Sequence, residues 1–302
     1  LGLQKLGAKI IYTLPGRTKE LQIPILLGKF ERNMKPTAVI ALANYMLRIA
    51  EVAKEEEIDP REFGIKKLIY SSAAEMLSER KKRMLEETYN ARAYDALGLV
   101  EVAAGPSIAA ECEERNGLHV WENYFIIEVI DPKTKERLGP GETGELVITS
   151  LENVAHPIIR YKTGIVTQIL DAEKCGCGRT GVKIGKIIGR TDEMMNVKGV
   201  LLNPKDVEEV LLGIPGIGTE YRVIIREIRG LDDVLIITEM KRGFIGEIET
   251  FDLSIATGIL AKEIVRTFKA AFNITPRVEV VPYGTMKRGK VKRFVDLRKP
   301  LT

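Results

Sequence analysis

Three cysteines and one histidine could together bind a metal ion. The chain contains three cysteines, Cys112, Cys175 and Cys177, and one of its two histidines, His119, follows Cys112 after six intervening residues. Zn²⁺ is bound tetrahedrally by thiolate sulfur and neutral imidazole nitrogen, so this set would complete a four-ligand site. Because no coordination position would remain open, such a site would be structural. It would pin the segment "ECEERNGLH" to the loop "CGCG".

Two other interpretations of the cysteines stay open. A redox pair is disfavoured, because C-x-C lacks the spacing and context of a thioredoxin-like motif. The cysteines could also be unrelated buried side chains. The C-x-C spacing is tighter than that of most zinc sites, so the zinc interpretation depends on the use of every cysteine. The other histidine, His156, is interpreted as a packed or half-exposed side chain.

The composition is that of a soluble globular protein of two domains. The chain has 302 residues, of which 45% are hydrophobic and 29% charged. Its first residues lack the basic start, apolar core and cleavage site typical of a signal peptide, no apolar run approaches about 18 residues, and the cysteines are too few for a disulfide framework. We therefore expect a cytoplasmic protein with reduced thiols and no membrane partner. It starts without Met and could begin inside a longer protein.

The net charge of +4 is mild and is concentrated near the end of the sequence. The basic stretch "MKRGKVKRFVDLRK" has few interleaved aromatic residues and no accompanying nucleic-acid-binding motif. A solvated loop followed by an edge strand is enough to explain it. We therefore expect no nucleic-acid partner.

The first hundred residues alternate strand and helix patterns. Strands are predicted at "AKIIYTL", "PTAVIAL" and "IKKLIYSS", and helices at "TKELQIPILLGKFERN", "NYMLRIAEVAKEEE" and "SERKKRMLEETYN". Ser78 is a natural N-cap for the last of these helices. The β-α-β-α order favours a Rossmann-like parallel sheet.

After about residue 118 the pattern becomes one of antiparallel strands. Beyond Asp192, helices alternate with strands again, and the helix "NPKDVEEVLLGI" begins with Asn203 as N-cap and Pro204 at its first position. We expect an α/β and α+β protein with two domains, residues 1–191 and residues 192–302.

Five separated stretches together resemble one family. They are "SSAAEMLSER", "YDALGLVEVAAGPSIAAECEERNGLHVWEN", "GETGELVITSLENVAHPIIRYKTG", "CGCGRTGVKIGKIIGRTDEMMNVKGVLLNPKDVEEVL" and "MKRGKVKRFVDLRK". Their order and spacing resemble the phenylacetate–CoA ligases and the related archaeal deazaflavin-coenzyme adenylylating synthetases, members of the AMP-forming, acyl-adenylating superfamily. The resemblance implies a large adenylate-forming domain and a small mobile C-terminal domain. The family's phosphate-binding loop lies upstream of the matching region, and "LPGRTKE" is too short and too poor in Ser and Gly to replace it.

The resemblance also implies roles for particular residues. Glu101 matches a glutamate that helps to hold Mg²⁺ on the ATP phosphates, and Gly98 lies in the same nucleotide-binding stretch. Arg190 would contact the nucleotide, and Asp192 would be the hinge of the small domain. Lys290 in "RGKVKR" matches the adenylation lysine. Without the resemblance, these would be a surface glutamate, a turn residue and one lysine of a basic loop. Many family members carry a similar set of cysteines and histidine.

The sequence departs from the family pattern at four positions of the nucleotide site. Leu97 replaces a tyrosine that would stack on adenine, and Val100 replaces a hydroxyl residue that would bond phosphate. Ile165 replaces the aspartate that would bond the ribose hydroxyls, and Ala73 stands in place of a glycine. Ile165 beside a ribose would leave polar groups unpaired, at about 1–3 kcal/mol each.

Three functions remain in competition. The chain could activate a small carboxylic acid with ATP as an acyl-adenylate, releasing AMP as the acyl group passes to coenzyme A. It could instead adenylylate a deazaflavin coenzyme. It could also be a degenerate, non-catalytic relative with a structural or regulatory role, so whether it is an enzyme stays uncertain. The resemblance implies a homodimer, and the acyl substrate is not identified by the sequence.

Overall fold

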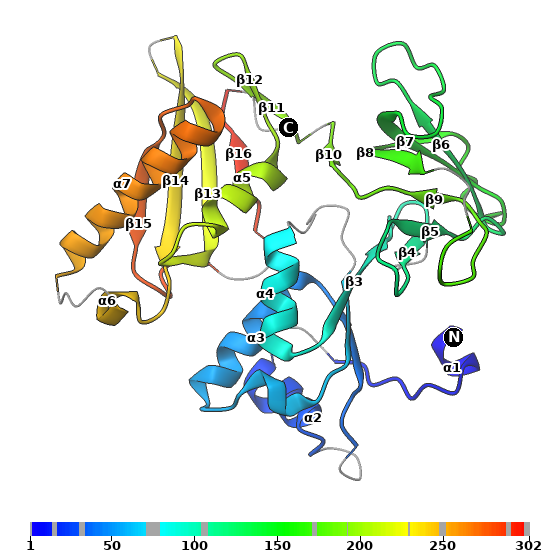
Figure 1. The fold of residues 1–302 in the computed structure, drawn as a ribbon, viewed down its shortest axis with the longest axis horizontal. Coiled ribbons are helices and arrows are strands. Elements are labelled where there is room, and N and C mark those ends of the chain that lie inside the picture. The colour runs from blue at the N-terminus through cyan, green and yellow to red at the C-terminus, as the bar shows by residue number, and fades with distance from the viewer. Residues whose placement is uncertain are drawn as a thin grey trace. The chain divides into compact units, whose positions relative to one another are not determined.

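The computed structural model consists of two compact units, and its helices and strands are labelled in Figure 1. The first comprises residues 1–70 and 84–93, and the second comprises residues 71–83 and 94–302. The structure describes residues 2–13, 17–29, 34–70, 79–103, 108–170, 174–191, 193–228, 230–247, 252–287 and 291–298.

A parallel strand pair lies at the centre of the first unit. Strand β1 (Ala38–Ala41) pairs in parallel with β2 (Lys67–Tyr70), and helix α3 (Ala43–Glu55) forms the crossover that a parallel pair requires. The short helical segments of this unit are α1 (Gly2–Lys5), η1 (Thr18–Gln22), α2 (Ile23–Leu26) and η2 (Pro60–Phe63). The predicted β-α-β order of this region is confirmed.

The strand predicted at "AKIIYTL" is wrong for the part that the structure describes. Residues 8–13 have no regular secondary structure, and Tyr12 is 82% exposed. A strand is stable only when its backbone groups pair with a neighbouring strand. Among the described residues no strand pairs with this segment, so its β-branched composition alone does not produce a strand.

An antiparallel sheet occupies the first half of the second unit. Its strands are β3 (Arg92–Leu97), which belongs to this unit from Tyr94 onward, β4 (Ala109–Glu111), β5 (Leu118–Val120), β6 (Phe125–Ile130), β7 (Thr143–Ser150), β8 (Tyr161–Leu170) and β9 (Lys183–Ile184). They are arranged in the order β3-β4-β5-β9-β8-β7-β6, and every neighbouring pair is antiparallel. Strand β10 (Gly189–Arg190) also pairs with β8. The antiparallel segment predicted from the sequence is confirmed.

The last hundred residues form a four-stranded sheet covered by helices. The elements are β11 (Met195–Val197), β12 (Val200–Leu202), α5 (Pro204–Leu212), β13 (Ile217–Ile228), β14 (Leu231–Met240), α6 (Phe244–Glu247), α7 (Leu253–Phe272), β15 (Arg277–Val281) and β16 (Phe294–Asp296). The sheet order is β15-β14-β13-β16. Helices α5 and α7 contribute Leu211, Leu260 and Phe268 to one buried core with the strand residues Val223 and Ile236.

Helix α5 begins as the sequence predicts. The side chain of Asn203 accepts a hydrogen bond from the backbone N–H of Lys205 at 3.1 Å, and Pro204 occupies the first helical position. Together, the parallel pair, the antiparallel sheet and the helix-covered C-terminal sheet confirm the predicted α/β and α+β fold class. The domain boundary at 191/192 stays a prediction.

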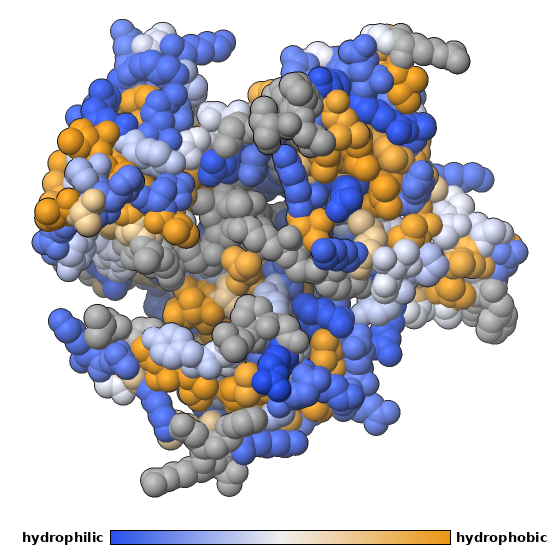
Figure 2. Space-filling view, turned by 180° about the vertical axis from the view of Figure 1, so that it is seen from behind, coloured by the Kyte–Doolittle hydropathy of each residue, from blue (hydrophilic) through white to orange (hydrophobic). Residues whose placement is uncertain are grey.

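The surface mixes polar and apolar side chains. On the face drawn in Figure 2, hydrophobic residues lie among hydrophilic ones. Within the part of the chain that the structure describes, no helix is both long enough and apolar enough to cross a bilayer.

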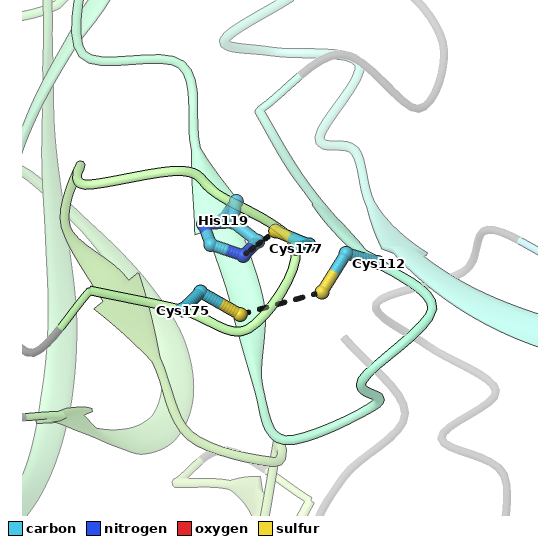
Figure 3. Close-up of side chains that lie close together, drawn as sticks. All are labelled: Cys112, His119, Cys175 and Cys177. Atoms are coloured by element: carbon cyan, nitrogen blue, oxygen red, sulfur yellow. Dashed lines mark hydrogen bonds between the residues drawn. The ribbon is translucent and has the colours of Figure 1, made fainter.

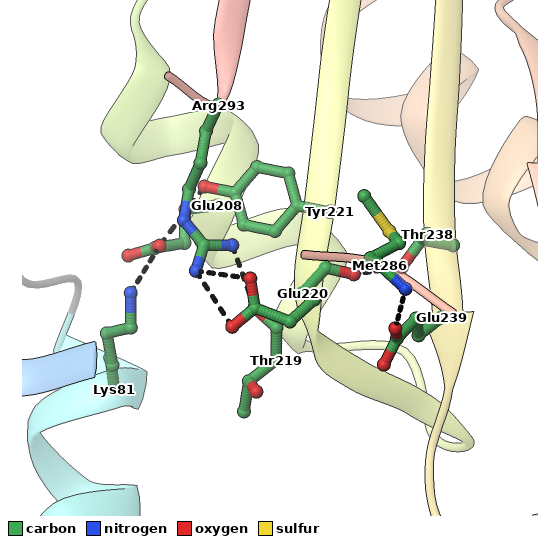
Figure 4. A network of polar contacts seen from close by, with 9 residues as sticks. All are labelled: Lys81, Glu208, Thr219, Glu220, Tyr221, Thr238, Glu239, Met286 and Arg293. Carbon is green, nitrogen blue, oxygen red and sulfur yellow. Dashed lines mark hydrogen bonds and ion pairs between the residues drawn. The ribbon is translucent and has the colours of Figure 1, made fainter. Parts of the chain in front are cut away.

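A buried ion pair links the beginning of helix α4 (Glu79–Tyr89) to helix α5 (Figure 4). Lys81 Nζ lies 2.7 Å from Glu208 Oε1, and the two side chains are only 2% and 6% exposed. Glu208 also accepts a hydrogen bond from the hydroxyl of Tyr221 at 3.1 Å. The guanidinium of Arg293 lies 4.7 Å from the centre of the Tyr221 ring and pairs with Glu220 at 3.3 Å. These contacts connect α4, α5, β13 and the segment that precedes β16.

We predict that Lys81→Met destabilises the protein by about 3–5 kcal/mol, because it leaves the buried Glu208 carboxylate without its counter-charge. The double variant Lys81→Met/Glu208→Gln should recover much of this loss, since glutamine is neutral and still accepts the Tyr221 hydrogen bond. Urea denaturation followed by circular dichroism measures the change.

The matched control is Lys186→Met, which breaks an exposed pair with Glu79 at 2.6 Å. The side chains of this pair are 57% and 53% exposed, so Lys186→Met should lower the free energy of unfolding by only about 0–1 kcal/mol. Equal losses for Lys81→Met and Lys186→Met would contradict the prediction.

Candidate functional site

The structure brings the three cysteines and His119 together (Figure 3). Cys112 follows β4 directly, His119 is the middle residue of β5, and Cys175 and Cys177 lie in the loop before β9. One ligand atom from each residue lies within 4.8 Å of all the others. Cys112, His119 and Cys175 are buried, and Cys177 is partly exposed.

Tight turns place these side chains. In the "CGCG" loop the N–H of Gly178 donates to the carbonyl of Cys175 at 2.8 Å, and Gly178 has φ +90°, which favours glycine. Between Cys112 and His119, Gly117 has φ +117°, and a Cβ there would lie 2.6 Å from the carbonyl oxygen of Ile184. A side chain at position 117 would therefore clash with the backbone, and the conformation at position 178 favours glycine.

Two of the distances between these ligand atoms match those around one tetrahedral ion. Two sulfurs bound to zinc at about 2.3 Å lie about 3.8 Å apart, and a bound sulfur and imidazole nitrogen lie about 3.5 Å apart. The observed distances are 3.7 Å between Cys112 Sγ and Cys175 Sγ and 3.5 Å between Cys177 Sγ and His119 Nε2. A disulfide would need about 2.05 Å, so all three thiols are free and suitably placed for a metal.

The protonation properties of His119 and Cys177 also suit metal binding. Burial, followed by the charges of Arg179 and Lys183, lowers the pKa of His119, which favours the neutral imidazole that binds metals. The backbone N–H of Arg179 is the main cause that lowers the pKa of Cys177 to about 7. Burial acts in the opposite direction on Cys112 and raises its pKa. Among the described residues, the buried His119 Nδ1 has no hydrogen-bond partner. The other ring nitrogen, Nε2, is the one that faces Cys177 Sγ.

Three residues beside the cluster were not identified from the sequence. Asn116 Oδ1 lies 3.8 Å from Cys175 Sγ and accepts a hydrogen bond from Lys183 Nζ at 3.2 Å. Arg179 Nη1 lies 3.5 Å from Cys177 Sγ. A basic residue near cysteines is a weak sequence signal, and the position of Lys183 depends on strand register, which the sequence does not give.

Strand β8 connects two residues of the expected nucleotide site. The hydroxyl of Tyr161, the first residue of β8, donates to Glu101 Oε1 at 3.2 Å. Four residues further along β8, Ile165 is the register partner of Arg190 on β10. The positions of Tyr161 and Ile165 are about 13 Å apart along an extended strand. Glu101 and Arg190 are therefore both held beside one segment of β8.

The remaining expected residues are only partly visible. Gly98 follows β3 directly and is partly exposed, three positions before the exposed Glu101. Asp192, Lys290 and Ala73 lie outside the described residues, as does the predicted N-cap Ser78. The roles of Asp192 and Lys290 stay predictions.

Two of the substituted positions belong to the hydrophobic core. Leu97 and Ile165 are 1% and 0% exposed and pack in the same cluster as Ile108 and Leu146. Val100, by contrast, is 87% exposed. The apolar replacements at Leu97 and Ile165 thus contribute to packing rather than to a polar surface that could receive a nucleotide.

The sequence is similar to curated coenzyme A ligases over nearly its whole length. A family model described as the AMP-binding enzyme C-terminal domain matches residues 199–298. The phenylacetate–coenzyme A ligase of Thermus thermophilus is 33% identical, with 99% of this chain and 67% of that protein covered. The enzyme of the same name from Pseudomonas putida is 32% identical, with 98% of this chain and 64% of that protein covered. The chain thus spans about two thirds of the length of these relatives.

Solved structures of CoA ligases are also similar to this chain. The 2-hydroxyisobutyryl-CoA ligase, in the postadenylation state with 2-HIB-AMP, is 27% identical and has a TM-score of 0.85. The match covers 98% of this chain and 61% of that one. An anthranilate CoA ligase is 16% identical with a TM-score of 0.62, which shows a common fold.

We predict that Ile165→Asp, which introduces the carboxylate expected from the family pattern, destabilises the protein by about 4 kcal/mol or more. The reason is that position 165 is fully buried among apolar side chains, where an unpaired carboxylate is costly. Thermal or urea denaturation measures the loss.

Val154→Asp is the control, because Val154 is 92% exposed and an exposed substitution should change stability by no more than about 0.5 kcal/mol. If both variants were equally stable, position 165 could accept a polar group, and the assignment of Ile165 to the core would be wrong.

Proposed function

The chain belongs to the phenylacetate–coenzyme A ligase family, and we propose on this basis that it takes part in AMP-forming acid–thiol ligation. In this reaction the carboxylate of an organic acid attacks the α-phosphorus of ATP, forming an acyl-adenylate and releasing pyrophosphate. The thiol of coenzyme A then attacks the acyl carbon, and AMP leaves. Because the chain spans only part of its relatives, the activity and the acyl substrate are both part of the proposal.

The observation that carries this proposal is the position of Glu101 and Arg190 along β8. Glu101 would hold Mg²⁺, because an exposed carboxylate is a suitable oxygen ligand for this ion. Arg190 would contact the phosphate or ribose of the nucleotide. Its side chain is 18% exposed and lies 3.8 Å from Glu193 at the closest approach. By their match to the family motifs, Gly98 would adjoin the nucleotide, Lys290 would stabilise the reacting carboxylate, and Asp192 would be the hinge.

A non-catalytic relative is the second candidate. It is favoured by the packing of Leu97 and Ile165 in the core, where neither side chain can stack on adenine or accept a ribose hydroxyl proton. In such a protein the fold would persist without nucleotide binding. Measurement of ATP affinity separates the two candidates.

We also propose that Cys112, His119, Cys175 and Cys177 bind one structural Zn²⁺. The support is the agreement of two ligand–ligand distances with tetrahedral geometry and the neutral form expected of His119. With four protein ligands, the ion would cross-link the β4–β5 segment to the loop before β9 and would take no part in catalysis. A homodimer and a cytoplasmic location are further expectations from the resemblance and from the composition.

Calorimetric titration with Mg-ATP tests the ligase proposal. Saturable binding is expected, and Glu101→Gln should weaken it by about 10–100-fold, because the variant loses a charged contact of about 1.5–3 kcal/mol. Glu152→Gln is the control, since Glu152 is also an exposed glutamate in the same unit.

Absence of binding at millimolar Mg-ATP would exclude this chain as a ligase by itself and would favour the non-catalytic candidate. Equal affinities for Glu101→Gln and the wild type would remove Glu101 from the metal-binding role and leave the other residues in place.

Metal analysis tests the zinc proposal. Protein prepared without chelator should contain about one Zn²⁺ per chain, and His119→Ala should retain much less after dialysis because one of four ligands is lost. His156→Ala is the matched control: His156 is exposed and is not among the clustered ligands, so its removal should leave the zinc content unchanged. Wild-type protein without metal would refute the centre, and full retention in His119→Ala would refute this ligand set.

A further inference from the structure

Lys183 is a buried cation whose described surroundings supply an amide oxygen rather than a carboxylate. The residue is 7% exposed, and its ammonium group donates a hydrogen bond to Asn116 Oδ1 at 3.2 Å. Among the described residues, no carboxylate lies within ion-pair distance of Lys183. A buried ammonium group is costly unless an opposite charge compensates it, so the surroundings of Lys183 should supply one.

The strand register places Lys183 beside the cysteine–histidine cluster. In the antiparallel pair of β5 and β9, His119 and Lys183 are directly opposite each other. Residues opposite each other in such a pair extend their side chains to the same face of the sheet. Asn116 Oδ1, which binds Lys183, is also 3.8 Å from Cys175 Sγ. Lys183 is therefore adjacent to His119, and Asn116 Oδ1 contacts both its ammonium group and the Cys175 thiol.

The charge of a metal centre at this site would match that of Lys183. Three thiolates carry three negative charges, a divalent ion carries two positive charges, and the neutral imidazole carries none. The loaded centre therefore has a net charge of −1. A single buried cation beside it would make the buried group of charges neutral, which reduces the cost of burying both.

We propose that Lys183 is the counter-ion of a tri-thiolate metal centre formed by Cys112, Cys175, Cys177 and His119. This inference rests on the proposed zinc centre and adds to it a residue that stabilises the loaded state without binding the metal. Lys183 would stabilise the loaded centre through its charge, because the ammonium lies beside a buried group of ligands whose net charge with a divalent ion is −1.

Two other charged residues beside the thiol loop are exposed. Arg179 lies 3.5 Å from Cys177 Sγ but is exposed, so solvent screens its charge. The carboxylate of Glu114, also exposed, lies over Gly176 at the rim of the loop and partly offsets Arg179. Lys183 is buried and is therefore expected to have the largest effect of these three residues.

Zinc affinity, measured by competition with a chromophoric chelator, tests the inference. Lys183→Met removes the charge but keeps an unbranched side chain, and we expect zinc to bind about 10–100-fold more weakly, as for other residues that support metal ligands. Lys183→Arg keeps the charge and should bind within a few-fold of the wild type. Lys174→Met is the matched control, because Lys174 is exposed beside Cys175 and its loss should have little effect.

A second measurement separates a counter-ion from a packing role. Urea denaturation of Lys183→Met should show unchanged or greater stability without metal, since an uncompensated buried charge is removed, and lower stability than the wild type with zinc. If Lys183 contributed only through packing of its aliphatic carbons, Lys183→Met would change the stability of the metal-free and the zinc-bound protein equally. Cobalt(II) absorption bands of thiolate coordination would establish that the variant still forms the centre.

The outcomes of these measurements are distinct. If wild-type protein binds no zinc, the centre itself is refuted. If wild type and Lys183→Met bind zinc equally tightly, or if the variant loses the same stability with and without metal, the counter-ion inference is wrong while the zinc centre stands.

Discussion

The antiparallel pairing of β5 with β4 and β9 is the interaction on which the candidate metal site depends. In β5, His119 lies opposite Ala110 of β4 and opposite Lys183 of β9. The first pairing sets the hairpin that carries Cys112, and the second aligns the strand that follows the "CGCG" loop. Because the period of a strand is two residues, a shift of one residue in either pairing would turn His119 away from the thiols. Three short strands thus determine which side chains meet.

Strand β8 has a comparable role for the residues of the expected nucleotide site. Its first residue bonds Glu101, its fifth pairs with Arg190, and its inward side chains belong to the core. The same strand therefore presents polar positions at one end and apolar packing at Ile165. The fold is thus retained with an apolar core residue, Ile165, at the position where the resemblance led us to expect an aspartate. Retention of the fold is separate from retention of the activity.

The sequence was informative wherever local patterns decide structure. Helix periodicity predicted α3, the cap residues Asn203 and Pro204 predicted the start of α5, and the strand pattern after about residue 118 predicted the antiparallel sheet, because these signals lie within a few neighbouring residues. The set of cysteines and histidine was also predicted, since counting residue types is enough to suggest it.

The features that the sequence did not reveal depend on contacts between distant segments. The contribution of Lys183 and Asn116 arises from strand register, and the buried pair of Lys81 and Glu208 joins helices that are 127 positions apart. The segment at residues 8–13 has a strand composition and forms no strand, because composition cannot supply a pairing partner. No local pattern distinguishes these charged residues from those on the surface.

The separation of the clustered ligands along the chain also sets an order of events during synthesis. Cys112 and Cys175 are 63 positions apart, and strands β6, β7 and β8 lie between His119 and Cys175. A ribosome releases the N-terminal half of the ligand set first, so the nascent chain offers one thiol and one imidazole well before the other two thiols emerge. The three intervening strands can form their local antiparallel pairs during this interval. We therefore expect the complete ligand set to close only after the last two cysteines have emerged, when β6, β7 and β8 are already available to pair.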